Sequence, residues 1–280
     1  MSEYVSPIAS RCRVIDDSNY HTFLSDPGAS WYGRGRIARD YEKHPYGSIF
    51  GAYDGPIIPR DEWRDRIEEM DRTGTRLSDI VRYHRLKTKN QQQTNFCWGN
   101  APVQALQVIR AKEGQPYVSL SPASICCPIT NFRNVGGFGT DALKWLSEHG
   151  AVPTELWPDN AIDRRYYTIE NKEIALKYRV DEWRELEYRN FDAMMSCLLL
   201  RLPVPGGHDW WRHEILHLDP VALPRGRFGT RYWNSWGDNY GEDGMDILDE
   251  SKATAEDAVV PRTALGFVGD ADHLPASNLV

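Results

Sequence analysis

The sequence has no long hydrophobic run and no cluster of basic residues, and each absence excludes a class of protein. No window approaches the roughly 18 consecutive apolar residues that a membrane-spanning helix requires. The first residues lack the basic start and apolar stretch of a secretory signal peptide. The 33 basic residues are outnumbered by 40 acidic ones, for a net charge of −7. We therefore expect neither nucleic acid nor an anionic membrane among the partners.

The cysteine count argues against a disulfide framework. The chain has 5 cysteines in 280 residues, an odd number in a protein large enough to be stable without cross-links. They are Cys12, Cys97, Cys126, Cys127 and Cys197. This usage indicates a reducing compartment, with at least one free thiol.

The composition is that of a globular protein with an extension. Hydrophobic residues make up 41% of the chain and charged residues 26%, enough for a full core. Residues 1–75 are rich in glycine, proline, tyrosine and arginine, which predicts an irregular extension wrapped on the main body. Within it, Trp63, Ile67 and Met70 recur at helical spacing and predict a short docked helix over 59–72.

One cysteine lies where a thiol becomes a nucleophile. A polar, turn-prone stretch from residue 90 leads into a helical pattern that begins at Cys97 and stops at Gly114. The free N–H groups and positive dipole end of a helix start favour thiolate, and an imidazolium nearby would complete an ion pair. The alternative is a small buried core cysteine, the commoner fate of a free thiol.

The sequence predicts the remaining helices and strands only with approximate bounds. After Leu77 and Ile80 the chain is expected to run extended through Leu86 to Asn90. A helix carrying Leu143 and Leu146 follows the Gly136–Gly137 pair, which either shapes a tight turn or leaves the backbone bare for another chain. A second helix is expected over 191–200, and short strands from residue 202 onward.

A short metal-binding pattern competes for one histidine. His213, Glu214 and His217 match H-E-x-x-H, which on a helix holds zinc between two imidazoles with the glutamate as base. Glycines just before the match and Pro220 just after it favour a strand instead. A zinc metallopeptidase using residues 213–217 remains an alternative, but we expect no metal.

Four separated motifs make the chain resemble the papain-like cysteine peptidases. A glutamine, five residues and then Cys-Trp occur as Gln91, Cys97 and Trp98. His213 opens a predicted strand, and N-S-W-G-D-N-Y-G-E-D-G begins at Asn234. The Gly-Gly pair before a helix is the fourth motif. The resemblance covers roughly residues 76–250, and compact members of this kind occur in bacteria and their viruses.

The resemblance implies a role for each matched residue. Cys97 would be the nucleophile, His213 the general base and acid, and Asn234 the group that orients the imidazole. Gln91 would donate to the oxyanion. Trp236 would cover the His–Asn hydrogen bond.

Substrate backbone would lie along Gly136 and Gly137, beside Trp98. The substrate would be a peptide or protein, and the chemistry needs no cofactor.

The resemblance also implies an α+β fold of two lobes. A helical lobe over 76–188 would face a β-rich, barrel-like lobe over 189–265, leaving a tail at 266–280. The extension 1–75 lacks the family's prosegment pattern. Because it joins directly to the strand leading into Gln91 and shows no sequence built to lie along Gly136 and Gly137, we expect it to dock away from the active site and to mediate protein assembly. The alternative function is a structural scaffold, for example in a viral particle, so the location is expected to be cytoplasmic or virion-associated.

Overall fold

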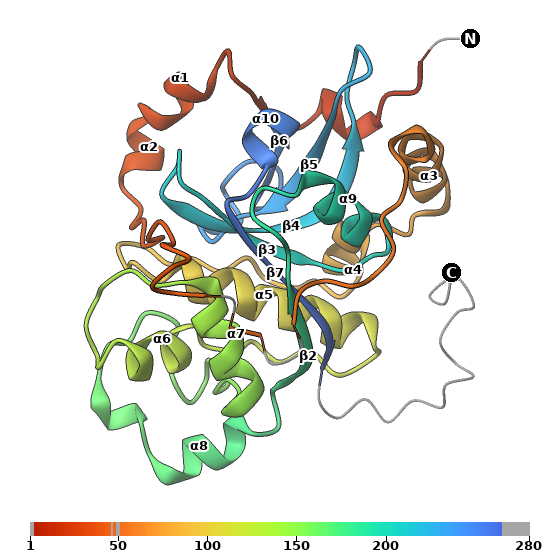
Figure 1. Cartoon of the computed structure of the whole chain (residues 1–280). Coiled ribbons are helices and arrows are strands. Elements are labelled where there is room, and N and C mark those ends of the chain that lie inside the picture. Colours follow the sequence, from red (N-terminus) through yellow and green to blue (C-terminus); the bar gives the residue numbers. More distant parts are fainter. Residues whose placement is uncertain (1–2, 46, 49–50, 265–280) are drawn as a thin grey trace.

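A mixed seven-stranded sheet runs through the molecule, with strands from both ends of the sequence (Figure 1). The computed structural model describes residues 3–45, 47–48 and 51–264. The spatial strand order is β1-β6-β5-β4-β3-β7-β2. The strands are β1 (Val14–Ile15), β2 (Val180–Glu185), β3 (Val204–His208), β4 (His213–Ala222), β5 (Phe228–Trp233), β6 (Met245–Asp249) and β7 (Asp257–Ala264). Neighbours pair antiparallel, except the parallel pair β1 and β6.

The helices divide between the two sides of this sheet. They are α1 (Tyr20–Leu24), α2 (Pro27–Ser30), α3 (Arg60–Thr73), α4 (Leu77–Tyr83), α5 (Cys97–Lys112), α6 (Ala123–Ile129), α7 (Gly139–Glu148), α8 (Ile169–Ala175), α9 (Phe191–Leu199) and α10 (Glu250–Ala253), with 3₁₀ turns at Pro7–Ser10 and Arg164–Tyr166. Helices α6, α7 and α8 gather beside α5, away from β5 and β6 (Figure 1). The helical and β-rich parts predicted from the resemblance are therefore both present.

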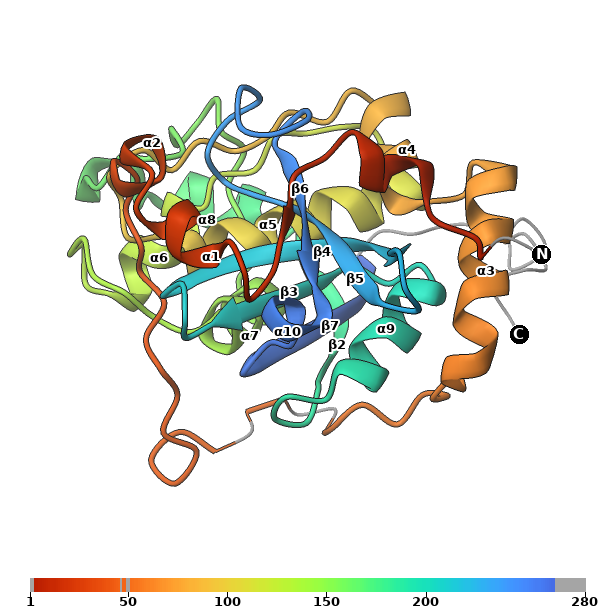
Figure 2. The same ribbon diagram turned by 90° about the horizontal axis from the view of Figure 1, so that it is seen from above.

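Strand β4 is buried along its whole length because helices cover both of its faces. Leu216 and Leu218 pack with residues of α4 and α5, whereas Ile215 belongs to the cluster that contains α9. Successive side chains of a strand point to opposite faces, so one strand joins two cores. Seen from above, α5 and α9 lie on either side of β4 (Figure 2).

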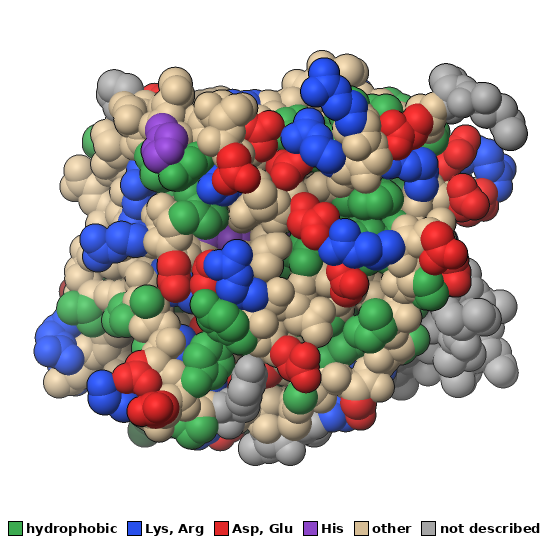
Figure 3. All heavy atoms as spheres, turned by 45° about the horizontal axis from the view of Figure 1, so that its top comes forward, with side chains coloured by type: hydrophobic (Ala, Val, Ile, Leu, Met, Phe, Trp, Pro, Cys, Tyr) green, Lys and Arg blue, Asp and Glu red, His purple; other side chains and the backbone are tan. Residues whose placement is uncertain are grey.

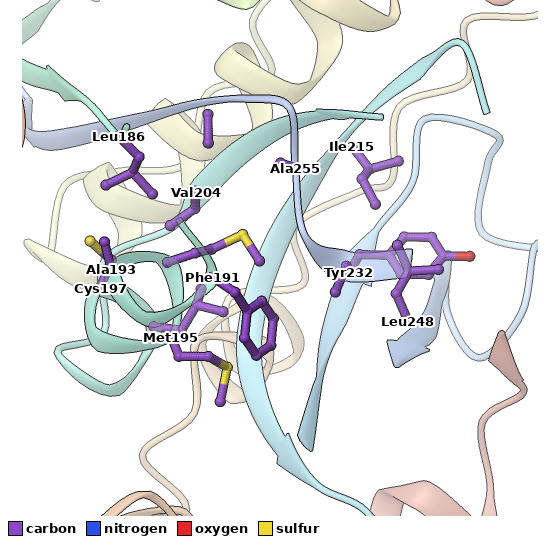
Figure 4. Packing of buried hydrophobic residues seen from close by; sticks show 14 of the residues in the cluster. Leu186, Phe191, Ala193, Met195, Cys197, Val204, Ile215, Tyr232, Leu248 and Ala255 are labelled. Atoms are coloured by element: carbon purple, nitrogen blue, oxygen red, sulfur yellow. The ribbon is translucent and has the colours of Figure 1, made fainter. Parts of the chain in front are cut away.

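Helix α9 supplies much of the core on its face of the sheet. Its residues Phe191, Met195 and Cys197 are buried together with Ile215 and Tyr232 of the strands (Figure 4). The expected helix over 191–200 is thus confirmed, and its Cys197 lies in the core. All five cysteines are free.

The N-terminal extension is docked on the body. Trp63 and Ile67 of α3 are fully buried in the same cluster as α9, and Met70 is 6% exposed. β1 extends the sheet beyond β6. The predicted helix at 59–72 is confirmed as α3, and its apolar side packs on the body.

Two predictions about the backbone differ from the structure. Residues 77–83 form α4, a helix that was not predicted and that extends past Ile80 into the segment expected to be extended. Its start is closed by the Arg76 N–H and the Asp79 carboxylate, with no Ser, Thr or Asn at the cap position. β2 lies within the range assigned to the helical lobe, yet it pairs with β7 in the sheet. The predicted tail at 266–280 lies outside the described residues.

The surface shows both signs of charge. Acidic and basic side chains are interspersed over the face drawn in Figure 3. In the described ranges, no helix is both long and apolar enough to span a bilayer.

Candidate active site

The predicted nucleophile lies at the first residue of a helix. Cys97 begins α5, and no side chain caps this helix start. The N–H groups of the first helical turn are therefore not occupied by a capping side chain, and they lie close to the Cys97 sulfur. Burial is complete, with an exposed fraction of 0%. The N–H of Glu214, the residue after His213, is among the groups that stabilise the charged sulfur. The beginning of β4 therefore lies against the start of α5.

The predicted histidine and asparagine form a hydrogen-bonded pair. His213 Nε2 lies 2.8 Å from Asn234 Oδ1, and both residues are fully buried. The amide oxygen also accepts from the Ser235 N–H at 2.8 Å, which orients the amide. Because this oxygen can only accept, Nε2 carries the proton. His213 Nδ1, which has no hydrogen-bond partner in the described structure, is left as the basic nitrogen.

Aromatic rings enclose this pair. The Trp236 ring lies 5.0 Å from the His213 ring, and the Trp211 ring lies 4.8 Å from it, centroid to centroid. Tyr32 of the extension stacks on Trp236 at 4.7 Å. The covering position expected for Trp236 therefore agrees with its geometry, and the rings keep water from the His–Asn hydrogen bond.

Gln91 is held by hydrogen bonds at both ends of its side-chain amide. Its Oε1 accepts a hydrogen bond from the Ser235 hydroxyl at 2.5 Å, which fixes the amide nitrogen on the side away from Ser235. That nitrogen donates to the Gly33 carbonyl at 2.8 Å and to the Thr94 carbonyl at 2.9 Å. A carbonyl oxygen from another segment thus already lies on the predicted donor.

Residues 33–37 of the extension, the cover segment, lie directly over these groups. The Gly35 N–H donates to Cys97 Sγ at 3.3 Å. The Gly137 N–H donates to the Gly35 carbonyl at 3.0 Å, and Ile37 N donates back to the Gly137 carbonyl at 3.4 Å. The cover segment and the glycine pair form a parallel bridge at Arg36 and Gly137. The glycine pair therefore leaves bare backbone for another chain, as the second alternative for it required.

Glycines let the cover segment approach this closely. A Cβ on Gly33 would lie 2.1 Å from the Thr94 oxygen, and one on Gly35 would lie 1.8 Å from the Asn95 oxygen. On the opposite wall, a Cβ on Gly137 would meet the Trp98 ring at 2.6 Å. No larger residue fits at these positions without a backbone shift.

The expectation that the extension docks away from the site is wrong. The prediction assumed that no sequence in the extension was suited to lie along Gly136 and Gly137, but Gly-Arg-Gly-Arg at residues 33–36 pairs with this backbone. A short glycine-containing strand needs only backbone hydrogen bonds to pair with an exposed backbone.

Burial keeps the thiol and the imidazole neutral. It raises the pKa of Cys97 to about 12, with the Glu214 carboxyl adding to the effect. Burial also lowers the pKa of His213 to about 3, although the hydrogen bond that His213 donates to Asn234 acts in the opposite direction. Desolvation disfavours the charged form of both groups. The prediction of a low-pKa thiolate is therefore wrong for the closed chain.

The H-E-x-x-H match lies in strand β4. Residues four apart in a strand are separated by about 13 Å, too far for two imidazoles to share one ion. His217 bonds instead to His208, with 3.0 Å between the Nε2 atoms, and to Thr230 at 2.7 Å. No cluster of three His, Cys, Asp or Glu side chains suited to a metal occurs among the described residues. His44 and His149 are exposed.

Sequence reasoning missed the site residues that come from the extension and from the asparagine motif. They are Tyr32, Gly33, Gly35, Arg36 and Ser235. Alternating glycine and arginine was visible in the sequence but suggested only a turn. Ser235 follows Asn234 within the matched motif, yet its bond to Gln91 depends on a contact 144 residues away in the chain.

The chain is similar in sequence to a curated protein and in fold to several solved structures. No family model matches the chain. Mouse cathepsin K is 24% identical over 224 residues, which cover 73% of this chain and 66% of cathepsin K, just under two thirds of its length.

Solved structures extend the comparison to the fold. Xylellain, a cysteine protease from Xylella fastidiosa, superposes with a TM-score of 0.53 at 21% identity, over 64% of this chain and 83% of its own. Digestive procathepsin L2 proteinase from the larval midgut of Tenebrio molitor gives 0.56 at 15% identity, over 88% and 87%. The predicted α+β fold and the predicted resemblance are confirmed, and the comparisons support the prediction of a cysteine-type peptidase.

Proposed function

Because this chain has the fold of the papain-like cysteine proteases, we propose that it hydrolyses peptide bonds with Cys97, His213 and Asn234. The observation that carries the proposal is the 2.8 Å bond from His213 to Asn234. This bond fixes the imidazole tautomer and leaves Nδ1 as the base. His213 also begins strand β4, which starts against the helix that carries Cys97. A structural scaffold has no physical need for this constellation.

The reaction follows from these groups. His213 Nδ1 takes the thiol proton, and the Cys97 sulfur attacks the carbonyl carbon of the scissile peptide bond. The N–H of Cys97 and the Gln91 amide stabilise the resulting oxyanion. The imidazolium gives its proton to the leaving amine, and water activated by His213 then releases the acyl group from sulfur.

The cover segment supports the assignment of the oxyanion donor. The Gly33 carbonyl takes a hydrogen bond from Gln91, as the carbonyl of a bound peptide would. Peptide backbone is therefore compatible with this surface. The same contact also means that the cover segment must leave before substrate enters.

The test compares the full chain with a full-length Gly35→Ala variant, in which the added Cβ prevents the cover segment from seating. Hydrolysis of a mixed fluorogenic peptide library is expected to rise at least tenfold, because the site becomes accessible. Gly33→Ala serves as a second opening variant, and Gly28→Ala, whose Cβ lies no closer than 3.2 Å to another atom, is the matched control.

Cys97→Ala in the Gly35→Ala background should abolish hydrolysis. Peptide cleavage that persists in this double variant would refute the assignment of the nucleophile.

A further inference from the structure

Arg36 of the cover segment puts its side chain into the protein rather than into solvent. The side chain is 2% exposed although it belongs to an irregular extension. The backbone bridge to Gly137 fixes the residue, and the preceding N–H lies on the Cys97 sulfur. The guanidinium therefore fills a buried space next to the segment that covers Cys97.

The pocket has room for this side chain because β3 carries a glycine there. A Cβ on Gly207 would lie 2.1 Å from Arg36 Nε. Nη1 of Arg36 donates to the Asp209 carboxylate at the rim and to the Ile37 carbonyl at 3.0 Å. Among the described residues, Nε and Nη2 have no hydrogen-bond partner.

Two buried carboxyl groups flank Gly207, since Glu214 and Asp257 are its partners on the two neighbouring strands. Glu214 of β4 is 3% exposed and Asp257 of β7 is 8% exposed. Burial raises the pKa of both, and the Arg36 charge acts in the opposite direction on each. Asp257 has a second cation in Arg39, 3.3 Å away, whereas for Glu214 the opposing influences are Arg36 and the Gly139 N–H.

We propose that this pocket is a substrate subsite for a basic side chain, arginine in particular. The proposal rests on the proposed peptidase function and names its substrate class. When the cover segment leaves, it takes its cation with it and exposes the Glu214 and Asp257 carboxyls to an entering peptide. Buried carboxyls are stable when paired with a cation. A substrate guanidinium that replaces Arg36 therefore gains an electrostatic attraction to these carboxyls that a neutral side chain does not have.

The geometry also limits where the arginine lies in the substrate. Gly35 contacts the nucleophile and Arg36 is the next residue, and an extended chain advances about 3.3 Å per residue. The recognised side chain therefore belongs to a residue one or two positions from the scissile bond.

The kinetic test uses fluorogenic peptides with arginine, lysine, citrulline or leucine at each position near the cleaved bond. Citrulline matches arginine in shape but carries no charge. With the full-length Gly35→Ala variant, kcat/KM for arginine is expected to exceed that for citrulline at least tenfold at one position. Lysine should fall between them, since it lacks the planar fork of donors.

Variants of the pocket residues test which side chains produce the preference for arginine over citrulline. Asp257→Asn should reduce the ratio of arginine to citrulline to less than threefold, whereas Asp181→Asn, an exposed acid on β2, should leave the ratio unchanged. Gly207→Ala should lower the rate for arginine more than the rate for leucine, because its Cβ takes the space of Nε. Equal rates for arginine and citrulline at every position, with hydrolysis that requires Cys97, would overturn the subsite and leave the peptidase function intact.

A binding measurement separates the two proposals if no peptide is hydrolysed. The full-length Cys97→Ala/Gly35→Ala protein is titrated with a fluorescent peptide of residues 31–39, W-Y-G-R-G-R-I-A-R, and with the same peptide carrying citrulline in place of Arg36. At least tenfold tighter binding of the arginine form supports the subsite independently of catalysis. Equal affinities would overturn it.

Discussion

Single residues decide whether this site is reactive. The sequence alone predicted Cys97, His213 and Asn234 as a set, and the structure brings His213 and Asn234 within 2.8 Å of each other. It could not predict the protonation state, because the pKa values depend on burial by a distant segment. In the closed chain both the thiol and the imidazole are neutral.

At this scale we predict that Asn234→Ala, in the Gly35→Ala background, lowers kcat by about 100-fold, within the range typical of a lost acid–base contribution. The asparagine orients the imidazole and fixes its tautomer, so the substrate KM should change little. Steady-state kinetics with one fluorogenic peptide measures both constants.

The matched control is His149→Ala, which removes an exposed imidazole from the end of α7. It should leave kcat unchanged. Loss of less than threefold in Asn234→Ala would show that the His–Asn bond does not serve catalysis.

Helices were predictable from the sequence where a hydrophobic stripe accompanied a recognisable start. The patterns at Trp63, Cys97 and Phe191 each gave a helix within two residues of its observed bounds. Helix α4 was missed because its first turn is closed by Arg76 and Asp79, with no ordinary capping residue. Propensity and capping signals act locally, whereas this helix depends on tertiary packing of Leu77 and Val81.

At the scale of elements we predict that Trp63→Ala lowers the free energy of unfolding by 3–5 kcal/mol, the typical loss for a large aromatic side chain in a core. Trp63 is fully buried, and its Nε1 donates to the Ile58 carbonyl at 2.8 Å. Urea unfolding monitored by circular dichroism measures the change.

Trp31→Ala provides the control from the same extension, since Trp31 is 52% exposed. Its effect should stay within about 0.5 kcal/mol. If Trp63→Ala behaved like this control, α3 would not be part of the folded core.

On the scale of the whole molecule, the extension is both a structural layer and a cover. It contributes a strand at one edge of the sheet, a helix on α9 and a segment over the nucleophile. The sequence predicted its docking from apolar anchors but not its path, because backbone pairing with Gly137 leaves no hydrophobic pattern. The assembly role of residues 1–75 and the cytoplasmic or virion location stay predictions.

The most direct test of the central claim, that Cys97 is a nucleophile closed off by residues 33–37, is the rate of its alkylation by iodoacetamide at pH 6, followed by peptide mapping. Wild-type protein and Gly28→Ala should react slowly at Cys97, because the buried thiol stays protonated until the pH approaches its raised pKa. Gly35→Ala should react there at least tenfold faster than wild type and ahead of the other four cysteines. Equal alkylation rates at Cys97 in wild type and Gly35→Ala, with the fold of both intact, would contradict the account.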